Sequence, residues 1–430
     1  MPDAASDAVV VGAGPAGLSA AVAMARAGLS VVVLERGEHP GDKNVQGAVF
    51  YPHALEELLP GAWKSPDAPM ERPVVEQRNC VVSGDRWVSF SHRDAALSGS
   101  PDACTIVRSR FDRWFARKAE EAGAEVYCGV KVDGVLREGE RIVGVRTAEG
   151  DELRSSVVVA ADGVNAILAQ KAGFRPELRP EEVALGAKEV LELPSERIEE
   201  RFGLEKGDGA TVEYLGSTSS GMLGYGFLYT NKESLSIGVG CRLCDYQRTG
   251  MRPSDHLEAL KRHPAVRRLI EGARPVEYSA HLIPEGGLAS MPPLVRPGFL
   301  TAGDAAQMVD PAFREGSNLA MTAGRLAGEA VVEAKRRGDF SQAGLSSYET
   351  RLKDSYVWKD LEDARGLAPA AAGIPDLLEY YPDLACRLAG LRFRADGRPK
   401  REHRREAFAL LRERGLLRIA RELWPFRKAL

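Results

Sequence analysis

Residues 8–20 read AVVVGAGPAGLSA, an apolar run followed by a glycine-rich turn and a stretch rich in alanine. Residues 8–11 predict a buried parallel strand, and residues 18–27 predict a helix. This glycine spacing between a strand and a helix is typical of dinucleotide binding, because the first helical turn offers free N–H groups and a positive dipole end to phosphates. The turn residues expected to bind a cofactor are Gly12, Gly14, Pro15, Ala16 and Gly17.

Each glycine of the turn has a separate function in this interpretation. Gly12 permits the sharp turn, Gly14 lets a pyrophosphate approach the backbone, and Gly17 lets the helix pack closely on the strand. A second apolar strand at 29–34 ends at Glu35-Arg36, about twenty residues past the glycines, where a carboxylate binds the ribose of an adenosine. A plain βαβ unit with an incidental glycine turn is the alternative, and the position of this carboxylate favours the dinucleotide.

Composition limits what kind of protein this is. A chain of 430 residues is long enough for two interwoven domains. No stretch approaches the roughly 18 continuous apolar residues of a membrane span, and residues 1–7 lack the features of a signal peptide, so we expect a cytoplasmic protein. The six cysteines are scattered, which favours reduced thiols over a disulfide framework.

Charge is distributed unevenly along the chain. The net charge is −3, but residues 387–430 hold fourteen Lys/Arg against five Asp/Glu, a net of +9. No nucleic-acid motif accompanies this basic region, so we expect no nucleic-acid partner. Apolar residues recur between the arginines of 407–419. This pattern leaves three interpretations open: contact with an anionic membrane surface, docking of an acidic protein, or a helix packed on the body with a solvated basic face.

Two further carboxylates are predicted at strand ends. The buried strand 156–161 ends at Asp162-Gly163, and the strand 299–302 ends at Gly303-Asp304. Carboxyl ends of parallel strands meet in the crevice where α/β sheets bind ligands. A polar helix start at 316–318 then exposes backbone N–H groups to an anionic or carbonyl-bearing ring. Three sites therefore converge, whereas an NAD site needs only the first.

A polar, glycine-containing loop at 37–47 follows the ribose-binding carboxylate, so Lys43, Asn44, Gln46 and Gly47 are expected along the cofactor, with an ordinary solvated loop as the alternative. The fold class is α/β, with a Rossmann-like cofactor-binding domain interwoven with an antiparallel-sheet domain. Resemblance to a flavoprotein family implies that the first domain binds FAD and that the second is a substrate or quinone domain. The expected boundaries are 1–174 with an excursion at 52–102, then 175–285 for the antiparallel sheet, 286–345 for the second part of the FAD domain, and 346–430 for a basic helical region.

The motifs together resemble the three FAD motifs of the p-hydroxybenzoate-hydroxylase-like flavoproteins. Within that superfamily the chain is most similar to the electron-transfer-flavoprotein dehydrogenase group, which includes FixC-type proteins and electron-transfer-flavoprotein:quinone oxidoreductase. Geranylgeranyl reductases are more distant relatives. The stretches that carry this resemblance are VLERG at 33–37, KNVQGA at 43–48, EYSAHLIPEGG at 277–287 and FREGSNLAM at 313–321.

The resemblance implies a role for each motif. The glycine turn faces the pyrophosphate, Glu35 the adenosine ribose, and Arg110 the phosphate side, while Asp304 binds the ribityl chain or the pyrophosphate. The start of the helix after residue 316 lies under the flavin ring, where its positive end stabilises an anionic reduced flavin. The remaining residues expected at the cofactor are Arg36, Ala161, Asp162, Gly163, Gly303, Gly316, Ser317, Asn318 and Leu319.

The function implied is electron transfer, in which FAD accepts electrons from an electron-transfer flavoprotein and passes them to quinone. Related quinone oxidoreductases hold a four-iron cluster in a cysteine-rich C-terminal region, but this chain has only Cys386 beyond Cys244 and lacks four thiolates at ferredoxin spacing. We therefore expect a separate ferredoxin-like subunit, possible contact with the inner face of the cell membrane, and a place in a complex that includes the electron-transfer-flavoprotein subunits. Bifurcation of electrons is left open.

Other functions stay open on the sequence alone: a prenyl double-bond reductase resembling geranylgeranyl reductases, an FAD monooxygenase, and a flavoprotein subunit whose main role is assembly. Electron transfer needs no nucleophile or acid–base pair, and no residue is nominated as catalytic. No metal site is expected either, because Cys241-Arg-Leu-Cys244 lacks a second CxxC or a histidine pair. A pair of reduced thiols at a strand end is the expectation for these cysteines.

Overall fold

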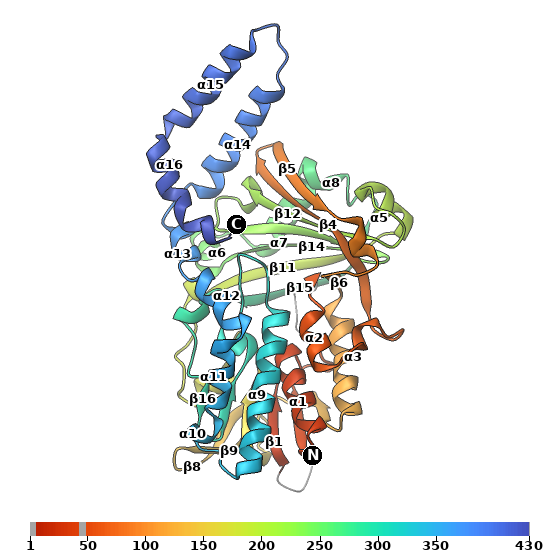
Figure 1. The fold of residues 1–430 in the computed structure, drawn as a ribbon, viewed down its shortest axis with the longest axis vertical. Coiled ribbons are helices and arrows are strands. Elements are labelled where there is room, and N and C mark those ends of the chain that lie inside the picture. Colours follow the sequence, from red (N-terminus) through yellow and green to blue (C-terminus); the bar gives the residue numbers. More distant parts are fainter. Residues whose placement is uncertain (1–5, 43–48, 430) are drawn as a thin grey trace. The chain divides into compact units, whose positions relative to one another are not determined.

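The computed structural model describes residues 6–42 and 49–429, and it divides the chain into two compact units (Figure 1). Unit 1 comprises Met1–Glu71, Asp102–Val183 and His281–Arg365, and unit 2 comprises Arg72–Pro101, Ala184–Ala280 and Gly366–Leu430. The helices after residue 346 are therefore shared between the two units. Within the described residues, no helix is both long and apolar enough to cross a membrane.

Unit 1 is built on a largely parallel sheet in the order β16-β17-β10-β1-β2-β7. Strand β1 pairs in parallel with both β10 and β2, and β7 and β17 extend the parallel arrangement on either side. The antiparallel hairpin β8–β9 continues from β10. The strand bounds are β1 Ser6–Val11, β2 Val31–Glu35, β7 Glu125–Cys128, β8 Val132–Glu138, β9 Arg141–Thr147, β10 Glu152–Ala160, β16 Val295–Arg296 and β17 Phe299–Thr301.

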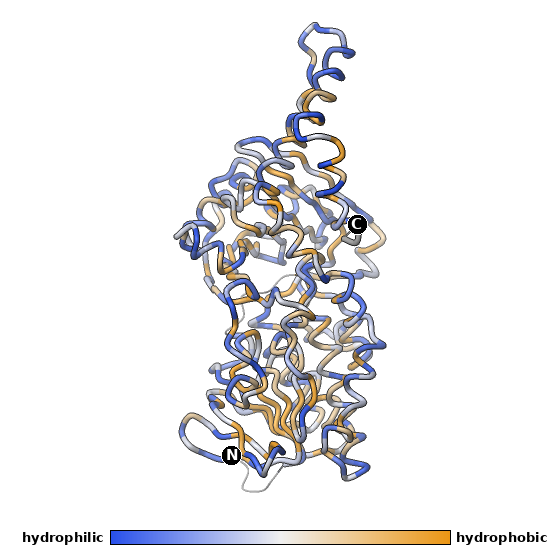
Figure 2. The backbone as a smooth tube through the Cα atoms, turned by 90° about the vertical axis from the view of Figure 1, so that its left-hand side faces the viewer, coloured by the Kyte–Doolittle hydropathy of each residue, from blue (hydrophilic) through white to orange (hydrophobic). Residues whose placement is uncertain are grey.

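The apolar runs of the sequence form the centre of this sheet because it is buried on both faces. Side chains alternate along a strand, so Val10 joins a core cluster with the helices while Val9 joins a second cluster on the opposite face. Figure 2 shows these strands as hydrophobic traces in the middle of unit 1. Every position of β1 except Asp7 is buried, and β1 pairs in parallel with its neighbours, which confirms the prediction of a buried parallel strand.

Helices α1 (Pro15–Arg26) and α9 (Ser317–Arg337) lie side by side against this sheet. Their backbones approach so closely that a Cβ on Gly324 would overlap the carbonyl oxygen of Ala16. Gly28, with a φ of 84°, follows the C-cap residue Ala27 and ends α1. The other elements of unit 1 are β3 Val49–Phe50, α2 His53–Leu58, β6 Cys104–Ile106, α3 Arg108–Glu121, α4 Ile167–Lys171, α10 Gln342–Leu345, α11 Ser347–Asp354 and α12 Tyr356–Ala364, with 3-10 turns at Ala62–Lys64, Pro180–Glu182, Gly287–Ala289 and Gly303–Ala306.

Unit 2 contains a second sheet in the order β15-β11-β14-β13-β12-β4, with β5 beside β4. Its neighbours are antiparallel where a hairpin joins them, as in β12–β13 and β13–β14. Strand β4 pairs in parallel with β12. Because β4 lies far from β12 in the sequence, no hairpin joins the two strands and a parallel pairing is possible. The bounds are β4 Met70–Ser83, β5 Arg86–Arg93, β11 Val183–Glu192, β12 Gly209–Gly216, β13 Gly224–Thr230, β14 Ser234–Arg242 and β15 Arg274–Pro284.

The last part of unit 2 is helical, as the sequence predicts for its C-terminal region. Helices α14 (Leu377–Phe393) and α15 (Lys400–Glu413) form a hairpin (Figure 1), closed by a small cluster around Leu384, Leu391 and Leu410. The other elements of unit 2 are α5 Ser195–Phe202, α6 Leu243–Thr249, α7 Pro253–Arg262, α8 Pro264–Arg267, α13 Leu367–Ala372 and α16 Leu416–Leu423, with 3-10 turns at Ala95–Ser98, Ser217–Ser219 and Trp424–Ala429.

A buried histidine couples the stability of unit 2 to pH. His256 is fully buried, and its Nε2 lies 2.7 Å from the carbonyl oxygen of Thr218. That oxygen only accepts, so Nε2 carries the proton and Nδ1 accepts from the Tyr246 hydroxyl at 2.8 Å. Both nitrogens are satisfied only while the ring is neutral, and burial lowers the pKa of His256.

We expect the free energy of unfolding to fall as the pH drops below about 6.5, because the unfolded chain then binds a proton that folded His256 resists. The measurement is the urea midpoint followed by circular dichroism between pH 7.5 and 5.5. A His256→Gln variant should start less stable and lose less on acidification. His92→Gln, at an exposed position of β5, should keep the wild-type dependence, and an unchanged slope in His256→Gln would contradict the assignment.

Candidate cofactor site

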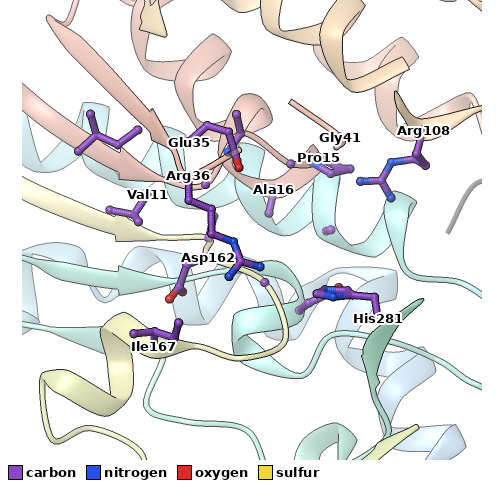
Figure 3. A pocket seen from close by; sticks show the side chains of 18 of the residues that line it. Val11, Pro15, Ala16, Glu35, Arg36, Gly41, Arg108, Asp162, Ile167 and His281 are labelled. Atoms are coloured by element: carbon purple, nitrogen blue, oxygen red, sulfur yellow. Dashed lines mark hydrogen bonds between the residues drawn. The ribbon is translucent and has the colours of Figure 1, made fainter. Parts of the chain in front are cut away.

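A pocket opens at the carboxyl ends of β1, β2 and β10, where the sequence predicts convergence of three strand ends (Figure 3). All of its lining residues belong to unit 1. The predicted residues that line it are Gly12, Gly14, Pro15, Ala16, Glu35, Arg36, Ala161, Asp162, Gly163, Asp304, Gly316 and Ser317. The structure therefore brings all three motifs to one cavity.

The three glycines of the turn differ in how much space surrounds their Cα atoms. Gly12 has a φ of 105°, and a Cβ there would overlap the Ala161 carbonyl oxygen. A Cβ on Gly17 would overlap the Gly12 carbonyl oxygen, so Gly17 packs inside the turn and does not line the pocket. A Cβ on Gly14 would have no atom within 4 Å. Only Gly14 thus faces space in which a ligand group can reach the backbone.

The carboxylate of Glu35 is held at the edge of the pocket by the backbone. Its two oxygens accept from the N–H of Ala13 at 2.9 Å and from the N–H of Gly37 at 2.7 Å. The side chain comes from the last residue of β2 and is fixed to the turn that follows β1. Each oxygen retains a lone pair for a ribose hydroxyl, so the geometry suits the predicted role.

Two half-buried aspartates, Asp162 and Asp304, line the pocket. Asp162 accepts from the N–H of Leu168 at 2.9 Å through one oxygen, and its other oxygen, Oδ1, is buried without a hydrogen-bond partner. Burial raises the pKa of Asp162 to about 6, against the opposing charge of Arg36. Burial likewise raises the pKa of Asp304 to about 6, against the opposing charge of Arg108. An incompletely bonded carboxyl facing a cavity marks a place for a donor from a ligand.

Arg110 lies outside this pocket, contrary to its expected phosphate-side position. Its side chain is 70% exposed and pairs with Glu71 at 3.1 Å. Arg108, the first residue of the same helix, lines the pocket and forms a two-pronged ion pair with Asp112 at 2.8 and 2.9 Å. Residues two apart on a helix point in different directions, so the structure replaces Arg110 with Arg108 as the candidate for the phosphate side.

The start of α9 contributes fewer residues than expected. Gly316 and Ser317 line the pocket, whereas Asn318 is buried and donates to Glu315 at 2.6 Å. Leu319 joins the main core, and Gly303 lies beneath Ala16, 2.7 Å from its Cβ if a Cβ were present. Gln46 and Gly47, like the rest of 43–48, lie outside the described residues.

Comparison with known proteins agrees with the FAD interpretation. Residues 5–200 match the model of an FAD binding domain, and residues 369–430 match the C-terminal domain of the ETF-QO/FixC family. Protein FixC of Bradyrhizobium diazoefficiens is 45% identical over 92% of each chain. The chain belongs to the FixC family. It is also 39% identical, over 98% of each chain, to the Escherichia coli protein named "Probable electron transfer flavoprotein-quinone oxidoreductase YdiS".

Solved structures support the fold of this FixC-family chain. A geranylgeranyl bacteriochlorophyll reductase-like protein of Thermoplasma acidophilum aligns with a TM-score of 0.72 over 95% of this chain and 98% of that one, at 20% identity. The family resemblance, the α/β fold class and FAD as cofactor are confirmed. The protein is an FAD-dependent oxidoreductase of electron transfer.

The pocket of the FixC-family chain fits FAD by its own features. The space above Gly14, the glutamate at the end of β2 and Asp162, whose Oδ1 lacks a hydrogen-bond partner, all belong to the lining of this pocket. Several lining residues were not predicted from the sequence, among them Arg108, Lys131 and His281. The helix around Arg108 was predicted, and its pocket-facing side could have been found from the buried face of its apolar residues.

The cysteines of the FixC-family chain supply no cluster in the part that the structure describes. Residues 6–42 and 49–429 contain no group of three or more His, Cys, Asp or Glu side chains placed to hold a metal ion. None of the six cysteines is in a disulfide. Cys241 is buried at the end of β14 and Cys244 is half-buried in α6, which agrees with a pair of thiols at a strand end.

Proposed function

We propose that this protein accepts electrons from an electron-transfer flavoprotein into its FAD and passes them to a quinone. The observation that carries the proposal is the match of residues 369–430 to the ETF-QO/FixC C-terminal domain together with near full-length similarity to a protein named as an electron transfer flavoprotein-quinone oxidoreductase. Bound FAD would supply one- and two-electron chemistry. The chain would supply binding, orientation and a fixed electrostatic environment.

Different residues of the pocket would bind different parts of FAD. Gly14 and the first turn of α1 would take the pyrophosphate, with Arg108 beside it, and Glu35 would take the adenosine ribose. Asp162 and Asp304 would accept hydrogen bonds along the chain of the cofactor; their raised pKa values mean that a neutral carboxyl is accessible near pH 6. Gly316 and Ser317 would place the positive end of α9 at the flavin ring, which favours added negative charge there.

A ferredoxin-like subunit is the partner that we propose for the C-terminal helices. Leu417 on α16 is 90% exposed, and Phe408, Leu416 and Trp424 are also exposed. Arginines lie close to these apolar residues in the sequence, for example Arg421 in α16. A surface that is both apolar and basic suits an acidic electron carrier. An anionic membrane would be attracted to the same surface, so pelleting with anionic vesicles at low and high salt, beside binding of the carrier, separates the two.

The direct test is anaerobic reduction of the holoprotein. Reduced electron-transfer flavoprotein should bleach the bound FAD, and a short-chain quinone should restore its absorbance, with or without the ferredoxin-like subunit. NADPH alone should leave the flavin oxidised. Bleaching by NADPH would favour a monooxygenase or a prenyl reductase instead. If no quinone reoxidises the flavin, with or without the ferredoxin-like subunit, quinone is not the acceptor. The protein would then be a flavoprotein subunit whose main role is assembly of a complex.

A further inference from the structure

His281 stands in the cofactor pocket without a function assigned to it. It lies near the end of β15, and it lines the pocket together with Leu282 and Ile283. Arg36 at the end of β2 and Arg108 at the start of α3 line the same cavity. Figure 3 shows His281 across the pocket from Pro15 of the glycine turn, with Arg108 beside Pro15 and the end of the Arg36 side chain near Asp162. That turn is where the pyrophosphate is expected.

The charges of the pocket keep this histidine neutral while no anion is present. Burial lowers the pKa of His281, and the positive charges of Arg36 and Arg108 lower it further. The other ionisable groups that line the cavity are Glu35, Lys131, Asp162 and Asp304. A neutral imidazole offers one N–H donor, whereas the protonated ring offers two.

We propose that His281 binds the diphosphate of FAD and takes up a proton when the cofactor enters the pocket. This inference rests on the cofactor site described above and not on the identity of the electron donor or acceptor. A diphosphate carries about two negative charges, and an opposite charge within about 4–6 Å favours the protonated ring. The anion therefore reverses the field that Arg36 and Arg108 impose, and the imidazolium adds charge-assisted hydrogen bonds.

The consequence is a pH-dependent affinity for FAD. A group whose pKa is higher in the complex than in the free protein takes up a proton on binding, so affinity rises as the pH falls through the interval between the two pKa values. Asp162 and Asp304, with pKa values of about 6, also titrate in this pH range, in the wild type and in a His281 variant alike. The part that belongs to His281 is therefore the difference between the wild type and a His281 variant.

The test measures FAD release from the holoprotein on dilution, by recovery of flavin fluorescence, between pH 6 and 8. The Kd of the wild type should rise with pH by roughly three- to tenfold more than that of His281→Gln, because one linked proton gives at most tenfold per pH unit. His281→Asn repeats the comparison, and circular dichroism checks that each variant is folded. His53→Gln is the matched control: burial also lowers the pKa of His53, but this residue pairs with Tyr356 and does not line the pocket.

Competition with fragments of FAD shows which part of the cofactor His281 binds. ADP carries the diphosphate and adenosine does not. The dissociation constant of ADP, calculated from displacement of FAD with the FAD Kd measured at each pH, should therefore show the His281-dependent pH effect, and that of adenosine should not. Equal pH dependence in the wild type and both His281 variants would overturn the proposal. The proposal would also be overturned if the affinities of adenosine and ADP showed the same dependence on pH and on His281. Neither outcome bears on electron-transfer flavoprotein or quinone, so a failure here is distinguishable from a failure of the proposed function.

Discussion

Replacing Arg72 by methionine should lower the free energy of unfolding of unit 2 by about 3–5 kcal/mol, the usual loss when one partner of a buried ion pair is removed. Arg72 is 1% exposed, and its guanidinium donates to the carbonyl oxygens of Asn231, Asp208 and Lys232. It also pairs with Glu199 at 3.0 Å. Methionine fills part of the volume but leaves these acceptors without their donor. The measurement is the urea midpoint by circular dichroism.

A matched control exists in the neighbouring helix α5. Arg197 pairs with Glu200 at 3.0 Å, but both side chains are more than 60% exposed. Its replacement by methionine should change the free energy of unfolding by less than about 1 kcal/mol, since exposed pairs contribute little. If the two variants lose similar stability, Arg72 does not tie the segments of unit 2 together as its hydrogen bonds indicate.

Two alanine substitutions in the glycine turn should weaken FAD binding for different reasons. In Gly17→Ala the new Cβ overlaps the Gly12 carbonyl oxygen, and such overpacking costs roughly 1–3 kcal/mol, or about 5- to 150-fold in affinity if the turn alone absorbs it. In Gly14→Ala the new Cβ meets no protein atom. That variant should therefore keep its thermal stability as apoprotein and lose affinity only, because the methyl group occupies the approach of the pyrophosphate.

The comparison requires both FAD affinity and the melting temperature of the flavin-free protein. Gly240→Ala, on β14 of unit 2, is the control, because a Cβ there also meets nothing within 4 Å, and it should change neither quantity. An unchanged FAD affinity in Gly14→Ala would show that the pyrophosphate does not pass over this residue. A stable Gly17→Ala protein with normal affinity would remove the packing role of Gly17.

The N-terminal half of the site was predictable because its signal is local. The strand, the turn and the helix of 8–26 are consecutive in sequence, and the glycine positions follow from backbone sterics that need no distant partner. The carboxylates of Glu35, Asp162 and Asp304 were predictable for a related reason, since each directly follows an apolar run and parallel strands end at one edge of a sheet. Their convergence in one pocket follows that rule.

The structure differs from the sequence-based expectations where the orientation of a side chain depends on distant packing. The sequence shows three arginines in 108–113, but which of them faces the pocket depends on how α3 packs against the rest of unit 1. Asn318 was expected at the ligand, yet Glu315 takes its amide and buries it. The parallel pairing of β4 with β12 was equally hidden, because more than a hundred residues separate the two strands.

The sequence by itself determined a dinucleotide-binding βαβ unit, extended to FAD by the strand-end aspartates and the family motifs, since local sterics and strand-end chemistry suffice for both. Only the tertiary structure decided which cations surround the pocket. Arg108, Lys131 and His281 come from segments far apart in the chain, and their side chains meet only after the sheet has closed and the helices have packed. The pKa of His281 depends on that meeting, because burial and the nearby arginines, rather than the residue type, lower it.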